Sequence, residues 1–356
     1  MKLEHTFWNN RSVFLTGHTG FKGAWLSLIL QRLGAKVTGY ALDFPAGKPL
    51  FTGAQIASGM NSVIGDILNQ KQMGSVLAEA KPEIVIHMAA QSLVRESYRN
   101  PIESFHTNVM GTANLLESVR NAKGVRAVIV VTSDKCYENR HWEWGYREND
   151  PLGASDPYSA SKGCAELVTA SYRSSFFNPE SYNKHGVAIA SARAGNVFGG
   201  GDFGKDRLIA DCIQAFANKE PVRLRNPAST RPWQFVLNLL GGYLMLAEKL
   251  HRDGPAYGEG WNFGPEGDPI TVQNVANQMA SLFGGGATVE VDHGNHPHEA
   301  QALGLDSAKA RLKLGWRPTI DFQSALEQTV AWYTSYIACK DVRKISIEQI
   351  ETTLFE

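Results

Sequence analysis

Tyr158 and Lys162 lie four residues apart in the stretch Tyr-Ser-Ala-Ser-Lys. Asp156 and Pro157 come just before them, and proline is favoured in the first turn of a helix. Residues four apart share one helix face, so the two side chains would be neighbours. An ammonium group beside a phenol favours the phenolate, which can take a proton from an alcohol at neutral pH. The same spacing is common on solvated helices, so the pair gains its meaning from the rest of the chain.

Three polar residues, Ser133, Asp134 and Lys135, follow an apolar run at residues 128–131 that predicts a buried strand. Open α/β sheets bind ligands at the edge where the strands end. A carboxyl group and an amine placed there can act as an acid and a base. The alternative, a solvated Asp-Lys pair after a strand, is less favoured once the same scaffold also positions Tyr158.

A glycine-rich loop connects a predicted strand at residues 11–15 to a predicted amphipathic helix at residues 24–33. Its glycines have the spacing G-x-x-G-x-x-G instead of the commoner G-x-G-x-x-G. Gly17 would permit a tight turn, Gly20 would let the backbone approach a pyrophosphate, and Gly23 would let helix and strand pack closely. The pyrophosphate would lie at the N-terminus of the helix, where amides and dipole favour anions. An ordinary glycine-rich turn is the alternative.

Asp43 follows a second predicted strand at residues 36–40, 20 residues after Gly23. An acid at this position suits the hydroxyls of an adenosine ribose and disfavours a 2′-phosphate, so NAD is predicted in preference to NADP. The alternative is an aspartate that caps a turn. Asp66 and Ile67 follow a third predicted strand and could border the adenine.

An apolar run at residues 84–87 predicts another buried strand. Residues that let a flat cofactor lie close follow its carboxyl end: Ala89, Ala90 and Gln91. His87 is predicted to be a core histidine with its hydrogen bonds satisfied, not a catalyst. Asn108 is predicted to lie on a buried helix face, bond backbone groups and support the edge of the sheet.

In the second half, a predicted strand at residues 188–193 leads into a glycine-rich loop that contains Asn196, and Arg207 heads a predicted helix. Cationic and aromatic residues then cluster: Arg223, Arg225, Arg231 and Trp233. In a chain without net charge this cluster suits a diphosphate, because guanidinium groups pair with phosphate oxygens and a tryptophan can cover a ring. A solvated basic loop is the alternative. We favour a ligand role for Arg231 and leave Arg223 and Arg225 open.

Composition limits the function. The 356 residues are 43% hydrophobic, which suffices for a large core and two lobes. Lys+Arg and Asp+Glu are equal at 35 each, so no overall field favours nucleic acid or an acidic membrane. No signal core and no apolar run of bilayer length is visible. The four cysteines are scattered, which indicates reduced thiols in a cytoplasmic protein. The histidines at residues 293–298 lie in a Gly/Pro loop, so no metal site is predicted.

Taken together, three motifs resemble the extended short-chain dehydrogenase/reductases: Thr-Gly-His-Thr-Gly-Phe-Lys-Gly at residues 16–23, Ser-Asp-Lys at residues 133–135 and the Tyr-x-x-x-Lys pair. Within that family the chain is similar to the nucleotide-sugar 4,6-dehydratases, in particular to those that act on CDP-glucose. The resemblance extends from Val13 to about Trp332. It implies an α/β fold in which a Rossmann-type doubly wound parallel sheet is joined to a smaller mixed α/β substrate domain.

The resemblance also implies a division into domains. Residues 1–193 and 232–262 would form the NAD-binding domain, and residues 194–231 and 263–356 the nucleotide-sugar-binding domain. The expected assembly is a homodimer or a homotetramer. The expected product is a 4-keto-6-deoxy nucleotide sugar that feeds deoxysugar and lipopolysaccharide biosynthesis.

Losing water across C5 and C6 of a hexose is hard until C4 is oxidised, because only then is the C5 hydrogen α to a carbonyl. In the implied reaction Tyr158 takes the C4 hydroxyl proton, with hydride transfer to and from NAD, while Lys162 lowers the pKa of Tyr158 and holds the nicotinamide ribose. Ser133 bonds the C4 oxygen. Lys135 removes the C5 proton, and Asp134, with a raised pKa, protonates the departing C6 hydroxyl.

One departure from the family concerns the base. Many of these dehydratases have Thr-Asp-Glu at the turn, where the glutamate removes the C5 proton, whereas this chain has Lys135 in that place. A lysine must be neutral to act as a base. Burial and the charge of Lys162 would lower its pKa, while Asp134 would raise it, and the sequence leaves the outcome open.

Two sets of binding residues follow. The residues expected to hold NAD are Gly17, Thr19, Gly20, Phe21, Gly23, Asp43, Asp66, Ile67, Ala89, Ala90, Gln91, Asn108, Thr132, Tyr158 and Lys162. The residues expected to hold the CDP-sugar are Asn196, Arg207, Arg231, Trp233 and Glu299. In the family, an asparagine at the position of Asn196 touches the phosphate of the sugar nucleotide, and His298 or Glu299 would lie near the nucleotide.

Other functions stay possible from the sequence. A nucleotide-sugar 4-epimerase needs the same cofactor and tyrosine but no acid and base for an elimination, so Asp134 and Lys135 count against it. A 4,6-dehydratase for another nucleotide hexose would have the same motifs. An NAD-binding scaffold without turnover would be indifferent to the loss of Tyr158. A nucleic-acid role lacks any face of interleaved basic and aromatic residues.

Overall fold

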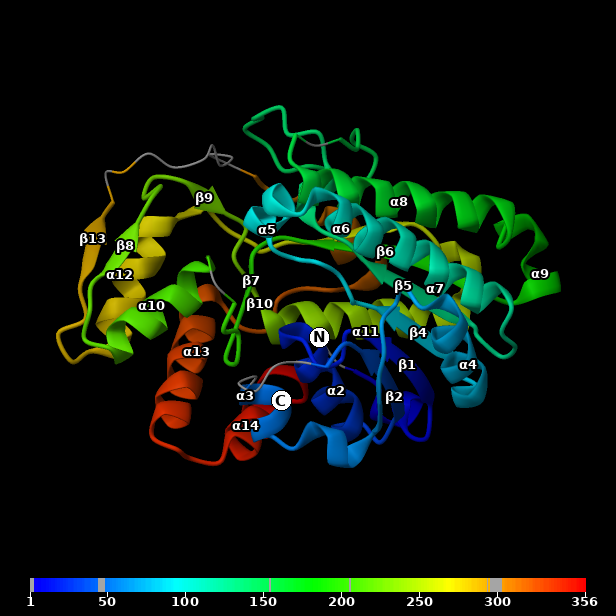
Figure 1. Ribbon diagram of the computed structural model, residues 1–356, viewed down its shortest axis with the longest axis horizontal. Helices are drawn as coiled ribbons and strands as arrows, with labels where there is room; N and C mark the ends of the chain where they lie inside the picture. Colours follow the sequence, from blue (N-terminus) through cyan, green and yellow to red (C-terminus); the bar gives the residue numbers. More distant parts are fainter. Residues whose placement is uncertain (1–2, 44–48, 154, 205, 293, 295–302) are drawn as a thin grey trace.

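The computed structural model describes residues 3–43, 49–153, 155–204, 206–292, 294 and 303–356. Within this part of the chain seven parallel strands form the central sheet, in the order β11-β6-β5-β4-β1-β2-β3 (Figure 1). The strands are β1 (Ser12–Thr16), β2 (Lys36–Ala41), β3 (Asn61–Ile64), β4 (Ile84–His87), β5 (Ala127–Val131), β6 (Ala188–Ala194) and β11 (Gly260–Phe263). The order reverses between β1 and β4, and open α/β sheets bind ligands beside such a reversal.

The sheet confirms the predicted doubly wound fold. Every residue of β4, β5 and β6 is buried, as expected for parallel strands covered on both faces. One face packs on α4 (Gln70–Ala80), α7 (Gly111–Arg120) and α8 (Pro157–Ser175). The other face packs on α2 (Phe21–Arg32) and α11 (Val236–Asp253). The predicted strands and long helices of this lobe are present, with small shifts at their ends.

Short elements connect these layers. They are α1 (His5–Trp8), α3 (Pro49–Gly53), η1 (Ile56–Gly59), α5 (Val94–Arg99), α6 (Pro101–Phe105), the π-helix η2 (His106–Met110), η3 (Asp134–Cys136), η4 (Pro179–Ser181), α9 (Tyr182–His185) and η5 (Gly254–Tyr257). Of these, η3 bears directly on function, because it forms the turn that leaves β5 at the carboxyl edge of the sheet.

A smaller group of elements lies at the left of Figure 1, beyond the carboxyl edge of the sheet. It contains α10 (Leu208–Ala217), α12 (Val272–Phe283) and α13 (Phe322–Ile337), with β8 (Val222–Leu224) paired to β13 (Val289–Val291). Shorter elements complete it: β7 (Val197–Phe198), β9 (Thr230–Arg231), β10 (Gln234–Phe235) and β12 (Ile270–Thr271). The π-helix η6 (Ala310–Leu314) packs instead on β11 and α11. The group is of the mixed α/β type expected for the smaller lobe, and its role as a substrate domain stays a prediction.

The many charges after Lys340 predict a peripheral C-terminal segment, and this prediction is wrong, because the segment forms a packed helix, α14 (Val342–Leu354). Ile350 and Leu354 are buried, and Arg343 Nη1 donates a hydrogen bond to the carbonyl of Ala54 at 2.7 Å. Apolar residues at intervals of three and four, hidden among charges in the sequence, give α14 this buried face. The helix packs on α11 and α3 and also on α13 of the smaller group, and the domain division stays a prediction.

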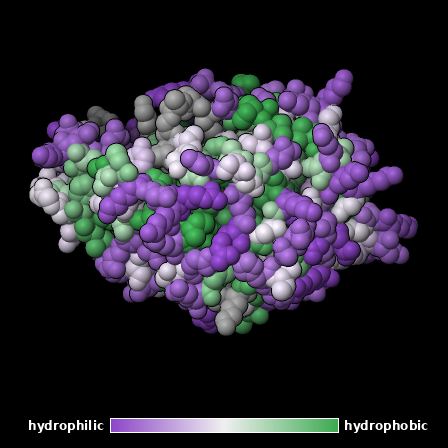
Figure 2. All heavy atoms as spheres, turned by 90° about the horizontal axis from the view of Figure 1, so that it is seen from below, coloured by the Kyte–Doolittle hydropathy of each residue, from purple (hydrophilic) through white to green (hydrophobic). Residues whose placement is uncertain are grey.

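No helix among the described residues is both long enough and apolar enough to cross a membrane. The face seen in Figure 2 carries hydrophilic side chains over most of its area, with smaller hydrophobic areas between them.

Candidate active site

Helix α8 brings Tyr158 and Lys162 to the carboxyl edge of the sheet. Its first residue is Pro157, and Asp156 caps it by accepting a hydrogen bond from the amide of Ser159 at 2.9 Å. The side chains of Tyr158 and Lys162 face inward, because only 8% and 6% of these residues are exposed. The predicted helix and the inward placement of both residues are therefore present.

The turn after β5 brings Ser133 and Asp134 to the same place. Ser133 Oγ donates a hydrogen bond to Asp134 Oδ1 at 2.9 Å and accepts one from the amide of Lys135 at 3.3 Å. Ser133 is close enough to the hydroxyl of Tyr158 to lower its pKa, so the turn and α8 meet at this point. Two segments that are separate in the sequence thus form one polar cluster.

The acidity of Tyr158 differs from the prediction. Burial raises the pKa of Tyr158 to about 12; the charges of Asp134 and Asp156 also raise it, whereas Ser133 and Arg207 lower it. The prediction that Lys162 brings this pKa below its ordinary value is wrong, because the loss of hydration is the largest effect. Arg207 is the cation that counteracts the burial.

Asp134 is buried, and this burial raises the pKa of its carboxyl group, although Lys135, Ser133 and Arg231 act in the opposite direction. The predicted direction is confirmed. Its second oxygen, Oδ2, has no hydrogen-bond partner among the described residues. A buried carboxyl group with one unpaired oxygen is suited to hold a proton and to donate it to a bound molecule.

Lys162 lies behind the turn, where its Nζ donates to the carbonyl of Val131 at 3.4 Å. Burial lowers the pKa of Lys162 to about 8, while the charges of Glu166 and Cys136 raise it. Lys135 is only partly buried. The role of Lys135 as a base stays a prediction.

The glycine loop leads from β1 into α2 as predicted. Gly17 has a φ of +74°, and a Cβ there would lie 2.7 Å from the amide nitrogen of Ala89. A Cβ on Gly23 would lie 2.0 Å from the carbonyl oxygen of Gly17. Glycine is therefore required at both positions, and it leaves the N-terminus of α2, capped by Gly20, with amides for an anion. The loop fits the pyrophosphate of a dinucleotide.

The other residues predicted around the adenosine lie at the ends of β2 and β3. Thr19 Oγ1 donates to the carbonyl of Leu42 at 3.4 Å, one residue before Asp43. Asp66 Oδ1 accepts a hydrogen bond from the amide two residues along the chain at 2.9 Å, and Ile67 is buried. Their contacts with a cofactor stay predictions.

Asn108 and His87 have the structural roles that the sequence predicts. Asn108 Oδ1 accepts from the amide of Gln91 at 2.9 Å, and its Nδ2 donates to the carbonyl of Gln91 at 2.9 Å and to Ser161 Oγ at 2.8 Å. It thereby ties the loop after β4 to α8. His87 Nδ1 and Thr16 Oγ1 are 2.7 Å apart, and burial lowers the pKa of His87 to about 3.

Two predicted substrate residues extend toward the catalytic turn. Arg207 precedes α10, where its Nη1 donates to Asp202 Oδ2 at 2.5 Å and its Nη2 to Ser92 Oγ at 3.3 Å. Arg231 is close enough to Asp134 for its charge to lower the pKa of that carboxyl group against the effect of burial. Both guanidinium groups thus lie where the smaller group of elements meets the edge of the sheet.

Other predicted substrate residues are held by the fold. Trp233 is 7% exposed, and its Nε1 donates to the carbonyl of Ile270 at 3.0 Å. The carbonyl of Asn196 accepts from the amide of Gln234 at 2.9 Å. Contacts of Trp233 and Asn196 with a sugar nucleotide stay predictions. His298 and Glu299 lie outside the described residues, as does most of the predicted metal-free loop around them.

Three cationic residues remain to be described: Arg223 and Arg225, whose roles the sequence leaves open, and Lys22, which the sequence did not predict as part of the site. Arg223 is largely exposed and pairs with Glu290 at 3.6 Å, whereas Arg225 pairs with Asp206 at 2.9 Å. Sequence reasoning missed Lys22, which follows the phenylalanine of the glycine loop. Burial lowers the pKa of Lys22 to about 7, and its charge interacts with those of Lys162, Arg207, Asp134 and Asp202. The signal available in the sequence was a lysine at the point where the glycine loop enters an apolar helix.

Sequence comparison identifies close relatives. The family model for GDP-mannose 4,6-dehydratase matches residues 14–329. The chain is 51% identical over 349 residues to CDP-glucose 4,6-dehydratase from Salmonella typhimurium, which covers 98% of this chain and 97% of that protein. It is 29% identical over 273 residues to dTDP-glucose 4,6-dehydratase from Streptomyces antibioticus, covering 76% and 75% of the two chains.

Solved structures share the fold. UDP-glucose 4-epimerase from Thermotoga maritima, in complex with UDP-glucose, superposes with a TM-score of 0.79 at 22% identity and covers 91% of this chain and 99% of that chain. The dTDP-glucose 4,6-dehydratase from Streptomyces venezuelae, with NAD bound, gives a TM-score of 0.77 at 24% identity and covers 93% and 99%. Since the fold accommodates both epimerases and dehydratases, the side chains of the site must decide between them.

Proposed function

Because this chain belongs to the GDP-mannose 4,6-dehydratase family, within the extended short-chain dehydrogenase/reductases, we propose that it removes water from a nucleotide hexose. It is an NAD-dependent hydro-lyase that converts CDP-D-glucose to CDP-4-dehydro-6-deoxy-D-glucose and water. The identity of 51% over nearly the whole chain to a CDP-glucose 4,6-dehydratase supports the choice of substrate. The product is an intermediate for deoxysugars of the lipopolysaccharide type.

One observation carries the choice of dehydration over epimerisation. The buried carboxyl group of Asp134 has a raised pKa and an unpaired oxygen, and it lies in the same cluster as Ser133 and Tyr158. An elimination needs an acid to protonate the departing hydroxyl, whereas an epimerisation at C4 needs none. These features support Asp134 as that acid.

The glycine loop supports NAD as the cofactor. Gly17 and Gly23 leave no room for a side chain, so the backbone and the N-terminus of α2 would hold the pyrophosphate, while Asp43 would hold the adenosine ribose. When bound, NAD supplies an acceptor and donor of hydride. Lys162 would hold the nicotinamide ribose, and the set of cofactor residues predicted above stands as part of this proposal.

The residues of the chain supply the proton transfers. Tyr158 accepts the proton of the C4 hydroxyl, Ser133 donates a hydrogen bond to the C4 oxygen, and Arg207 offsets the effect of burial on the tyrosine. Once C4 is a ketone, the C5 hydrogen is acidic. Lys135 removes it, and Asp134 gives its proton to the C6 hydroxyl, which departs as water. The C5–C6 double bond that remains would be saturated by hydride from the reduced cofactor at C6 and by a proton from Lys135 at C5, which gives the 4-keto-6-deoxy product. Arg231 and Asn196 would bind the diphosphate, and Trp233 and Glu299 complete the proposed substrate site.

The test is incubation of the purified protein with CDP-, dTDP-, UDP- and GDP-glucose without added NADH, in deuterated water. We expect loss of one water and uptake of one deuterium at C5 with CDP-glucose, read by mass spectrometry and NMR. A product that retains its C6 oxygen would show an epimerase instead, and a product without deuterium at C5 would exclude the proton abstraction.

Two further points belong to the proposal. The protein acts as a homodimer or homotetramer, which sedimentation would establish. It is cytoplasmic, which agrees with its four free cysteines, because reducing compartments keep thiols unpaired.

A further inference from the structure

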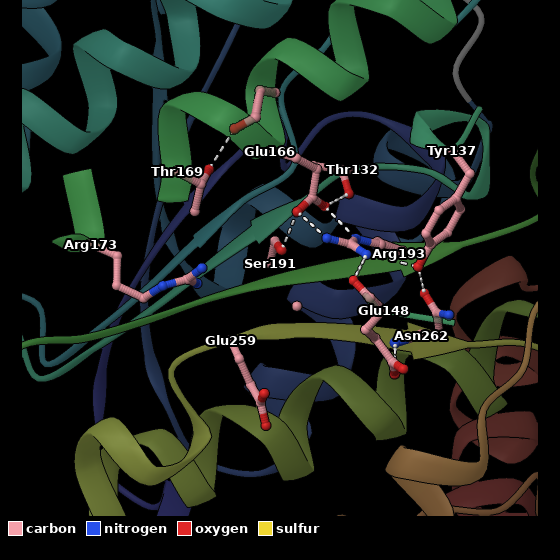
Figure 3. Close-up of polar contacts among 12 residues, drawn as sticks. Thr132, Tyr137, Glu148, Glu166, Thr169, Arg173, Ser191, Arg193, Glu259 and Asn262 are labelled. Carbon is pink, nitrogen blue, oxygen red and sulfur yellow. Dashed lines mark hydrogen bonds and ion pairs between the residues drawn. The ribbon is translucent and has the colours of Figure 1, made fainter. Parts of the chain in front are cut away.

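A buried ion pair lies directly behind the catalytic turn. Glu166 of α8 and Arg193 of β6 face each other with 4% and 6% of their side chains exposed (Figure 3). Arg193 Nε donates to Glu166 Oε1 at 2.9 Å, and Nη2 donates to Oε2 at 2.8 Å. Thr132 Oγ1 also donates to Oε1, and Ser191 Oγ donates to Oε2 at 2.6 Å. Every oxygen of the carboxylate is therefore satisfied, which a buried charge requires.

The pair contacts both ends of the turn that carries Ser133 to Lys135. Thr132, just before the turn, bonds Glu166. Tyr137, just after it, accepts a hydrogen bond from Arg193 Nη1 at 2.7 Å and donates one to Asn262 Oδ1 at 2.7 Å. Figure 3 shows these side chains converging between α8 and the strands. The entrance and the exit of the turn are thus fixed to one rigid unit.

The same pair lies next to the catalytic residues of α8. Tyr158 is one helical turn before Lys162 and Glu166 is one turn beyond it, so the three project from the same face of α8. Titratable groups from several packed elements interact with Lys162: Lys22 from α2, His87 from β4, Cys136 from η3 and Glu166 from α8 itself. The charge of Lys162 lowers the pKa of Lys22 and that of His87, whereas the charge of Glu166 raises the pKa of Lys162.

We propose that Glu166 and Arg193 are positioning residues for the dehydration, an inference that rests on the function proposed above. Their ion pair fixes the turn with Ser133, Asp134 and Lys135 at a set place relative to α8, so that the acid, the base and the tyrosine face one sugar. The charge of Glu166 also keeps Lys162 protonated. Neither residue touches the substrate.

The first test is the Glu166→Gln variant, which keeps the shape of the side chain and removes its charge. We expect kcat for CDP-glucose to fall about 100-fold with a nearly unchanged KM, because a small misplacement of reacting groups has costs of that order. We also expect the alkaline limb of the kcat profile to move about one unit to lower pH, since Lys162 loses its charge more readily without Glu166. A purely structural role would not move this limb.

A second pair of variants keeps the ion pair intact, in case an unpaired Arg193 prevents folding. Thr132→Val and Tyr137→Phe each remove one contact to an end of the turn, and each should lower kcat about tenfold without shifting the limb. The matched control is Thr169→Val, because Thr169 is also a buried threonine and, among the described residues, its hydroxyl bonds its own helix α8, through the carbonyl of Ala165. It should behave like the parent.

The outcomes separate the two proposals. If the parent protein forms no 4-keto-6-deoxy product from CDP-glucose, the proposed function is wrong. If the parent turns over and both turn variants retain its kcat, as Thr169→Val does, the positioning role is wrong while the function stands. An active Glu166→Gln variant with the pH limb of the parent would likewise overturn the role of the Glu166 charge.

Discussion

At the scale of single residues, the hydroxyl of Tyr158 is the group whose loss should affect chemistry alone. Phenylalanine keeps the ring in its buried position, so Tyr158→Phe should leave the midpoint of thermal unfolding within a degree or two. Turnover of CDP-glucose should fall about 10²- to 10⁴-fold, which is the usual contribution of a positioned acid or base. The measurement is product formation at saturating substrate. Tyr98→Phe, at an exposed tyrosine, is the control, and equal activity of the two variants would contradict the role of Tyr158.

Asp134 gives a second prediction, in which activity and stability move in opposite directions. Burial raises the pKa of Asp134, so its contribution to stability is present below the ordinary pKa of an aspartate and is lost as pH rises through the raised value. At neutral pH the buried carboxyl group therefore costs stability. Asp134→Asn removes this cost and should raise the urea midpoint, while product formation falls about 100-fold or more because the acid is gone. A destabilised variant, or one with full activity, would contradict this account.

The sequence located these residues but not their electrostatics. Tyr158, Lys162, Ser133 and Asp134 were found because spacing and position after a strand can be read directly. The pKa of Tyr158 could not be read from the sequence, because it depends on burial and on Arg207, which is far away in the chain. Lys22 was missed for the same reason: only the fold shows that the glycine loop brings its charge close to Lys162.

At the scale of elements, the cap of α8 is worth a measurable amount of stability. Asp156 accepts hydrogen bonds from both the amide and the hydroxyl of Ser159. Asp156→Ala should lower the free energy of unfolding by about 1 kcal/mol, measured by urea denaturation at neutral pH. Asp156→Asn should retain most of the stability that the cap contributes, because asparagine is also a good cap. Equal losses for both variants would show that charge, not capping, is what Asp156 contributes.

The strand β4 ends in a histidine that resists protonation, and this predicts acid sensitivity. The pKa of His87 falls from an ordinary 6.5 to about 3 because of burial, and that of His18 falls to about 4. Stability from the neutral rings is full above the ordinary pKa and is lost as pH falls toward the lowered values. Between neutral pH and about pH 4, the free energy of unfolding of His87→Gln should therefore fall by roughly 3 kcal/mol less than that of the parent. Identical losses in urea denaturation would refute this.

Elements with strong periodicity were predictable and weakly patterned ones were not. Strands β1, β4, β5 and β6 are apolar runs bounded by turn residues, and α8 begins at a proline, so local signals agree with the fold. The burial of α14 could not be predicted, because its buried residues alternate with charged ones in the sequence. The surface of α3 and α11 on which it packs forms only in the folded chain. The ion pair of Glu166 and Arg193 was not predicted for the same reason. Its two residues lie on a helix and on a strand that are separate in the sequence, and only the fold brings them together.

At the scale of the whole molecule, the site is divided between the sheet and the smaller group of elements. The glycine loop and Asp43 come from the first, and Arg207 and Arg231 from the second. The order of the strands and the reversal between β1 and β4 explain why the glycine loop, the Ser133 turn and Asp43 lie at one edge, because each of them follows a strand of the central sheet at its carboxyl end. Family resemblance, not periodicity, indicated which segments would form the second group.

This division predicts that a single substitution can abolish the binding of one ligand and leave the binding of the other intact. A ligand at 100 times its Kd stabilises the folded state by about 2.7 kcal/mol, so NAD and CDP should each raise the melting temperature of the parent by a few degrees. Arg231→Ala should abolish the shift caused by CDP and keep the shift caused by NAD, whereas Asp43→Ala should do the reverse. Arg223→Ala, at an exposed arginine of the same group as Arg231, should keep both shifts. If Arg231→Ala loses both, the two ligands stabilise a single cooperative unit and the proposed domain division is wrong.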